Sequence, residues 1–292
     1  MLAQFEEHLV LMQFSPSTVV NYLADLRALV RWGIDYVGEG FALSDLTPNT
    51  IRAYRAHVLE EKHCAPSTAN RKLQALRKFC AFAVQAGLMA HNPAAGVQLV
   101  QADGSLATTP LTQEQVQRLL EVSASEQPGL ARRDRAILML LLHTGLRVNE
   151  LVELRLDDVR FNHPGTYLIV ADGRHGETRC VPVEGELRHA LYEYLSVRPK
   201  VARETRLFLS REGRPLSVRS VQRIVSANAR SAGLEGVSAQ SLRRTYASHL
   251  LATTGDLALV SQRLGHQSLI TTTRYISQSS PDGVKASANL VK

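Results

Sequence analysis

Three times in its first seventy residues the chain places a proline and hydroxyl residues ahead of a helical run. The segments are Ser15-Pro16-Ser17-Thr18, Thr47-Pro48-Asn49-Thr50 and Ala65-Pro66-Ser67-Thr68. Ser and Thr side chains cap the free N–H groups of a first helical turn, and proline fits there because it has no N–H to satisfy. Apolar residues then recur at helical spacing, without strand-like alternation. The first hundred residues are therefore expected to form a bundle of about four helices.

The apolar faces of two of these helices are clear in the sequence. They comprise Val19, Tyr22, Leu23, Leu26, Leu29 and Val30 after the first signal, and Leu73, Leu76, Phe79, Cys80 and Ala83 after the third. Gly87 and Asn92-Pro93 are expected to end the last helix. The polar faces carry Arg52, Arg55, Arg71, Lys72, Arg77 and Lys78. These charges are expected either to be solvated or to contact nucleic acid.

The rest of the chain predicts a second unit of a different kind. Residues 101–110, QADGSLATTP, are small and polar, as expected of an exposed linker. Helical patterns follow at 112–123, 131–144, from about 148, and at 186–196, 217–232, 241–253 and 256–264. Strand patterns at 167–170 and 179–183 flank a turn-rich segment and predict a β-hairpin. The predicted fold is mainly α: a helical bundle at 1–100, a linker at 101–110, and a mostly helical domain with a small antiparallel β-sheet at 111–292.

Charge and cysteine content suggest the environment and the partner. The 34 Lys and Arg residues outnumber the 27 Asp and Glu residues, which gives a net charge of +7. Nucleic acid is a natural partner for such a surplus, although a merely basic protein has the same composition. Cys64, Cys80 and Cys180 lack metal-binding spacing and indicate a reducing compartment. Without a signal-peptide pattern or a long apolar run, a cytoplasmic protein with no membrane partner is expected.

Three segments place unusual polar groups beside apolar runs. The first is HTGLRVNEL at 143–151, the second is SLRRTYA at 241–247, and the third is LGHQS at 264–268, with Tyr275 nine residues after His266. Each alone is ordinary, since an arginine at a helix start is usually in a surface ion pair and a tyrosine is usually in the core. Their order along the chain makes them informative.

Taken together, TGLRVNEL at 144–151, SLRRTYASHLL at 241–251 and LGHQSLITTTRY at 264–275 make the chain resemble the tyrosine recombinase (phage-integrase-like) family, of the Xer and transposon-resolvase type. The resemblance covers essentially the whole chain. It implies a core-binding domain at 1–100 that clamps DNA and a catalytic domain at 111–292. It also implies Tyr275 as a nucleophile that forms a 3′-phosphotyrosyl link. Because the bond energy is kept in that link, neither a cofactor nor a metal ion is expected.

The same resemblance assigns roles to the other polar residues. Arg147 and Arg243 would clamp the non-bridging phosphate oxygens, for which the two-pronged guanidinium is well shaped. His266 would hydrogen-bond the scissile phosphate. Glu150 would orient Arg147 or its neighbours, although a plain helix-surface carboxylate is the alternative.

Two positions depart from the family pattern. The family usually has a lysine in the hairpin turn as general acid, where this chain has Arg174. A guanidinium, with a pKa of about 12.5–13.8, is a poor proton donor, and neighbouring His175 could donate instead. The family usually has a histidine three residues before the second arginine, where this chain has Gln240. An active enzyme with substituted accessory groups is preferred, and a slow or conditional enzyme is the alternative.

The expected partner is double-stranded DNA carrying inverted-repeat sites. Two protomers would bind each site, four would form the synapse, and accessory proteins could take part. The segment after Tyr275, ending in VKASANLVK, would dock on a neighbouring protomer or fray into solvent. Two other functions stay open: a type IB topoisomerase-like enzyme, and a DNA-binding regulator on an attenuated recombinase scaffold. The target site and the biological setting are not predicted.

Overall fold

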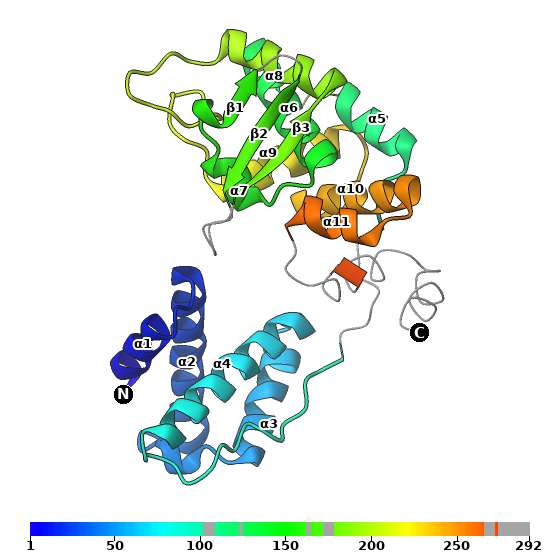
Figure 1. Ribbon diagram of the computed structural model, residues 1–292. Coiled ribbons are helices and arrows are strands. Elements are labelled where there is room, and N and C mark those ends of the chain that lie inside the picture. Colours follow the sequence, from blue (N-terminus) through cyan, green and yellow to red (C-terminus); the bar gives the residue numbers. More distant parts are fainter. Residues whose placement is uncertain (102–108, 123–124, 162–164, 172–177, 266–271, 274–292) are drawn as a thin grey trace. The chain divides into compact units, whose positions relative to one another are not determined.

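The structure is a computed structural model that describes residues 1–101, 109–122, 125–161, 165–171, 178–265 and 272–273 (Figure 1). The chain divides into two compact units, Met1–Asp103 and Gly104–Lys292. Each unit has its own hydrophobic core. The two units are described separately.

Unit 1 is a helical bundle. Its elements are α1 (Leu2–Leu11), α2 (Pro16–Val37), η1 (Leu43–Asp45), α3 (Pro48–Ala56), η2 (His57–Glu61) and α4 (Pro66–Gln85). The predicted helix starts are confirmed, since α2, α3 and α4 each begin at a proline. Ser15 and Thr47 accept a hydrogen bond from the backbone N–H three residues later, both at 3.2 Å. The third start differs, because the residue in the capping position is Ala65, which has no side-chain oxygen.

The core of unit 1 forms where α1, α2 and α4 pack together. The predicted apolar face of α4 is buried throughout, and so are Val19, Leu23, Leu26 and Leu29 of α2. Tyr22 on the same predicted face is partly buried, and Val30 is exposed at 39 %. Two stacked or tilted aromatic pairs, Trp32 with Tyr36 and Trp32 with Tyr54, close one end of the core.

Most of the basic residues singled out in unit 1 bind the protein itself. The Arg71 guanidinium and the Lys72 ammonium pair with the buried carboxylate of Asp25, the latter at 3.0 Å. Arg77 donates to the carbonyl oxygens of Ala94 and Val97. These bonds fasten the segment after α4 to the bundle.

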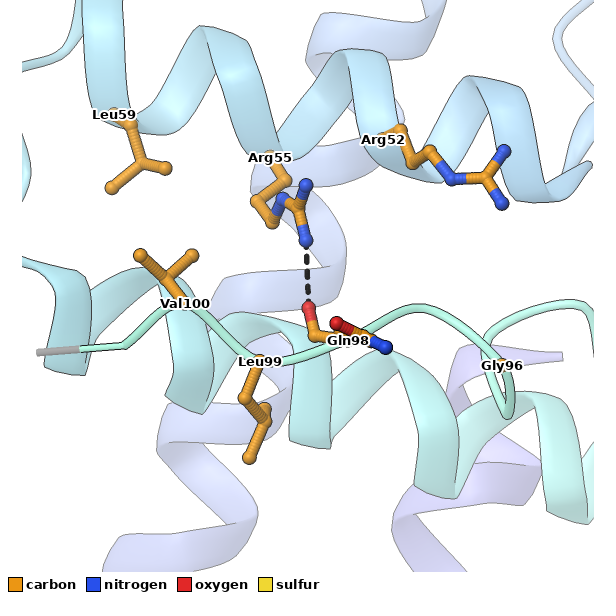
Figure 2. Close-up of a pocket in the computed structure, with 7 residues that line it drawn as sticks. All are labelled: Arg52, Arg55, Leu59, Gly96, Gln98, Leu99 and Val100. Atoms are coloured by element: carbon orange, nitrogen blue, oxygen red, sulfur yellow. Dashed lines mark hydrogen bonds between the residues drawn. The ribbon is translucent and has the colours of Figure 1, made fainter.

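A hollow of about 490 Å³ lies between α3 and the segment at 96–100 (Figure 2). Arg55 spans it, and its Nη1 donates to the Gln98 carbonyl oxygen at 2.7 Å (Figure 2). Arg52 lies about one turn earlier in α3, and its Nη1 donates to Asn49 Oδ1 at 2.7 Å. The hollow is thus partly closed by a structural hydrogen bond.

Unit 2 is mostly helical. Its helices are α5 (Gln113–Glu121), α6 (Pro128–Thr144), α7 (Val148–Glu153), η4 (Leu156–Asp158), α8 (Gly185–Val197), α9 (Val218–Ser231), α10 (Ala239–Thr254) and α11 (Leu257–Leu264). Helix α6 is the centre of the core, because every residue from Ala136 to Leu142 is buried and the helix packs against α8, α9 and α10. The helices predicted for this part of the chain are all present.

A small antiparallel sheet completes unit 2 (Figure 1). Strands β1 (Val159–Phe161), β2 (Thr166–Ala171) and β3 (Thr178–Val183) lie in the order β1-β2-β3, with Ile169 opposite Cys180. The predicted pairing of 167–170 with 179–183 is confirmed, and β1 is an additional strand. In β3 the side chains alternate, so Val181 and Val183 are buried and Cys180 is exposed. Arg179 is on the same side of the strand as the two valines.

Candidate active site

The first part of the site is the turn between α6 and α7. Helix α6 ends at Gly145, which has a left-handed backbone with φ 61°. A side chain at this position would collide with neighbours, since an added Cβ would lie 2.4 Å from Tyr246 Cδ1 and 2.9 Å from Leu264 Cδ2. Glycine therefore lets α6, α10 and α11 approach at one point. Two residues later, Arg147 begins α7 from an extended backbone conformation.

Glu150 binds Arg147 twice. One carboxylate oxygen, Oε2, accepts from the backbone N–H of Arg147 at 2.7 Å and so caps α7. The other, Oε1, accepts from Arg147 Nη1 at 2.8 Å. The Glu150 side chain is only 7 % exposed, whereas that of Arg147 is 38 % exposed. Glu150 is therefore a buried carboxylate beneath a partly exposed guanidinium, which differs from a plain surface carboxylate.

Arg179, at the beginning of β3, is a part of the site that the sequence analysis did not assign. Its Nη1 lies 3.0 Å from Glu150 Oε1 and its Nη2 lies 2.7 Å from Glu150 Oε2. This is the parallel, two-pronged geometry of an arginine–carboxylate pair. In the sequence the only signal was an arginine at the start of a strand of apolar residues, Arg179. That signal does not indicate which residue it pairs with.

The pKa of the Glu150 carboxyl is lowered. Burial acts to raise it, but hydrogen bonds and charge from Arg179, followed by hydrogen bonds from Arg147, outweigh that effect. The carboxylate is thus ionised at neutral pH despite its burial. It supplies a fixed negative charge at the base of the site.

Arg243 enters the site from the fifth residue of α10 and is 3 % exposed. Its guanidinium donates to the carbonyl oxygens of Gly145 and Leu264, the latter at 2.7 Å. Ser238 caps α10 by accepting from the Ser241 backbone N–H at 3.2 Å. This cap fixes the direction in which the helix begins and hence the path of Arg243.

Arg147 and Arg243 meet at the last residues of α11. Arg147 Nη2 donates to the Gly265 carbonyl oxygen at 2.8 Å, next in sequence to the carbonyl of Leu264 that binds Arg243. The last carbonyls of a helix lack helical partners and carry the negative end of its dipole, so they hold cations well. The structure thus brings together two of the predicted arginines, which are 96 residues apart in sequence.

The remaining predicted residues fall into two groups. Gln240 lies in the first turn of α10, three residues before Arg243, and is exposed. Arg174, His175, His266 and Tyr275 lie outside the described residues. The segment that leads to His266 and Tyr275 nevertheless begins at Gly265, which is bound by Arg147.

Two kinds of feature are absent from the described residues, a metal-ligand cluster and a membrane-spanning helix. In that part of the chain, no group of three or more His, Cys, Asp or Glu side chains is arranged to hold a metal ion. Within the same residues, no helix combines the length and apolar character needed to cross a bilayer.

Comparison with known families establishes the family of the chain. Residues 110–280 match the family model described as "Phage integrase family", and residues 2–87 match that described as "Phage integrase, N-terminal SAM-like domain". The chain belongs to the phage integrase family. The resemblance to tyrosine recombinases is thereby confirmed, and with it the prediction of an enzyme of the tyrosine site-specific recombinase class.

Similar proteins agree with this placement in the phage integrase family. The tyrosine recombinase XerC of Mycobacterium bovis strain BCG is 35 % identical over 283 residues, covering 94 % of this chain and 92 % of that protein. The fold matches that of a lambda integrase dimer bound to a COC′ core site, with a TM-score of 0.75, 19 % identity, and coverage of 96 % of this chain and 77 % of that one. A lambda integrase tetramer bound to a Holliday junction matches with a TM-score of 0.73, 19 % identity, and coverage of 94 % and 75 %. The predicted fold class, mainly α with a small antiparallel sheet, is confirmed.

Proposed function

We propose that this protein cleaves and rejoins DNA strands at specific sites through a covalent link between the DNA 3′-phosphate and Tyr275. The observation that carries the proposal is the meeting of Arg147 and Arg243 on adjacent carbonyls of α11. A guanidinium has five N–H donors, and Arg147 uses two of its own on Glu150 and Gly265. Among the described residues the other three have no partner, and the side chain is partly exposed. They are available to a phosphate oxygen.

The chemistry is a transesterification. The Tyr275 phenol loses its proton to solvent as its oxygen attacks the phosphorus and forms a phosphotyrosyl bond. The bond from phosphorus to the 5′-oxygen breaks, and its electron pair passes to that oxygen. The 5′-oxygen takes a proton from His175 or from solvent, with Arg174 stabilising its charge. Rejoining reverses these steps with a 5′-hydroxyl as nucleophile. Arg147, Arg243, His266 and Gln240 stabilise the charge on the phosphorane oxygens.

Helix α9 supplies a surface for the DNA backbone. Its buried side includes Val221, Val225 and Ala229, whereas Arg219, Arg223 and Arg230 lie on the exposed side. These arginines surround a shallow hollow of about 430 Å³ with Gln222 and Ser226. Three cations with neighbouring amide and hydroxyl groups are suited to phosphate contacts, and the polar side chains are suited to base edges. We infer that α9 binds DNA.

The relatives support a proposal for the wider assembly. Lambda integrase has been described as a dimer on a core site and as a tetramer on a Holliday junction. For this chain we propose two protomers on each inverted-repeat site and four in the synapse, in the cytoplasm, with residues 1–100 as core-binding domain, 101–110 as linker and 111–292 as catalytic domain.

Covalent capture tests the proposal. Duplexes that bind the purified chain are first selected from a random-sequence library. A nick is then placed next to the cleavage site, so that cleavage releases a short fragment, rejoining is prevented and the covalent adduct accumulates. The expected result is a protein–DNA adduct for the natural chain and none for Tyr275→Phe. Tight binding without an adduct would instead indicate the regulator, and relaxation of a supercoiled plasmid without exchange between two sites would indicate the topoisomerase-like activity.

A further inference from the structure

Arg179 is in contact with the site through Glu150 and has no role in the chemistry proposed above. It lies at the start of β3, only five residues after Arg174. Its side chain is 16 % exposed, less than half the exposure of Arg147. Both of its terminal nitrogens, Nη1 and Nη2, are bound to the Glu150 carboxylate, so its guanidinium is badly placed to bind DNA itself. Its position calls for another role.

We infer that Arg179 is a positioning residue for DNA cleavage, which holds the Glu150 carboxylate in the orientation that aligns the Arg147 guanidinium with the scissile phosphate. The inference rests on the proposed function, because this alignment matters only if Arg147 binds that phosphate. Arg179 acts through two other residues and does not itself touch the DNA.

The first support is the way the carboxylate is shared. Oε1 accepts from Arg147 Nη1 and Arg179 Nη1, at 2.8 and 3.0 Å. Oε2 accepts from the Arg147 backbone N–H and Arg179 Nη2, both at 2.7 Å. Arg179 thus provides half of the hydrogen bonds of a nearly buried charge. Without it, Arg147 would be the main partner of the carboxylate, and its guanidinium would be drawn toward Glu150 and away from the phosphate.

The second support is the connection that Arg179 makes between elements. Its own strand, β3, begins four residues after Arg174 in sequence, and its partner Glu150 belongs to α7. It also packs against the end of α11, since a Cβ added to Gly265 would lie 3.0 Å from Arg179 Nη1. One guanidinium therefore binds α7 and lies close to the end of α11. A change at Arg179 is expected to alter the position of Glu150 relative to β3.

The third support is the charge around Glu150. Arg147 approaches it from its own helix and Arg179 from β3. Farther out, burial raises the pKa of the Tyr246 phenol on α10, and the positive charges of Arg263, Arg179 and Arg243 act to lower it. Among the described residues, Glu150 is the carboxylate that pairs with Arg147 and Arg179. Loss of Arg179 removes the strongest attraction that keeps it ionised.

The test measures single-turnover cleavage of the nicked duplex by Arg179→Met and Arg179→Lys. A displacement of about 1 Å at a reacting group can cost about 100-fold in rate. We expect Arg179→Met to cleave about 30- to 100-fold more slowly, with the dissociation constant for the duplex changed by no more than about threefold. Arg179→Lys keeps the charge without the two-pronged geometry, so an intermediate rate is expected. Arg160→Met, at an exposed position on β1 of the same sheet, is the matched control and should cleave at the natural rate.

Two further readouts distinguish positioning from a general loss of structure. In Arg179→Met the pKa of Glu150 rises, so its cleavage rate should fall toward acidic pH within a range where the natural chain is unaffected. This dependence should vanish in the double variant Arg179→Met/Glu150→Gln. In the Glu150→Gln background, the Arg179 substitution should cost less than about threefold, because its partner is gone.

The outcomes are separable. If the natural chain forms an adduct and Arg179→Met cleaves at the same rate, the inference is wrong while the proposed function stands. Equal losses from Arg179→Met in the natural and Glu150→Gln backgrounds would also overturn it, since Arg179 would then act independently of Glu150. If Arg179→Met does not fold by circular dichroism, the same comparison is made with Arg179→Lys. The absence of an adduct from the natural chain would overturn both proposals.

Discussion

Replacing Gly145 by alanine tests whether the close packing of α6, α10 and α11 at this turn contributes to the stability of unit 2. Two costs apply at this position. The left-handed backbone, with φ 61°, costs an alanine about 1–2 kcal/mol relative to glycine. The added Cβ would also lie 2.4 Å from Tyr246 Cδ1 and 2.9 Å from Leu264 Cδ2, and forcing an atom into a packed core typically costs about 1–3 kcal/mol. The sum predicts a loss of about 2–5 kcal/mol in the free energy of unfolding.

The matched control for this substitution is Gly255→Ala. Gly255 ends α10 as Gly145 ends α6, its φ is 64°, and an added Cβ meets nothing within 4 Å. The control should therefore lose only the backbone cost of about 1–2 kcal/mol. The measurement is urea unfolding of the full chain followed by far-ultraviolet circular dichroism. The fluorescence of Trp32, the single tryptophan, reports unit 1 and should keep its midpoint in both variants, because unit 1 has a separate core.

Equal losses in Gly145→Ala and Gly255→Ala would refute the packing argument, since only the backbone cost would remain. A packing effect should also reach the site. Arg243 donates to the carbonyls of both Gly145 and Leu264, so displacement of Leu264 moves one of its two anchors. Gly145→Ala is accordingly expected to slow cleavage, whereas Gly255→Ala should leave the rate unchanged.

Three other predictions follow from individual contacts. Asp25→Ala leaves its two cationic partners uncompensated, so the Trp32-reported unfolding free energy of unit 1 should fall by about 1–3 kcal/mol. The pKa of Glu150 is lowered in the folded state, so the stabilisation by its charged form is present above the unfolded pKa of about 4.3 and is lost as pH falls through the folded pKa. In urea unfolding, Glu150→Gln should therefore lose more unfolding free energy at neutral pH than in acid. Equal losses at the two pH values would contradict this. Arg223→Gln should reduce the slope of log affinity against log salt by about one, with Arg188→Gln on α8 as unaffected control, in a titration of duplex DNA.

The helices were predictable because their signals are local. A proline at the first position and apolar residues at helical spacing define α2, α3 and α4 whatever the rest of the chain does. Strand β1 was missed because three residues, Val159–Phe161, are too few to show alternation, and the strand is stabilised by pairing with β2. The roles of Arg55 and Arg77 were also hidden, because each guanidinium bonds to a carbonyl that is 17 or more residues distant in sequence.

The candidate site shows the same division between local and distant information. The pair of Arg147 and Glu150 lies within one helical turn, so its spacing pointed to a contact. The contact between Glu150 and Arg179 joins a helix to a strand 29 residues away, and no spacing rule predicts it. The motif containing Arg243 identified the residue, but its burial and its bond to Leu264 depend on how α10 packs beside α11. Sequence thus identified the types of group, whereas the partners required the fold.

The balance of charge explains why the site is built at helix ends. Arg147, Arg179 and Arg243 with Glu150 carry a net charge of +2, and like charges held together oppose folding. Carbonyls at the ends of α6 and α11 reduce this repulsion, because they offer partial negative charge without cancelling the net charge. A second carboxylate would cancel more of this positive charge and would compete with a bound anion. One carboxylate shared by two arginines, with backbone carbonyls as the other acceptors, leaves the site folded and still attractive to an anion.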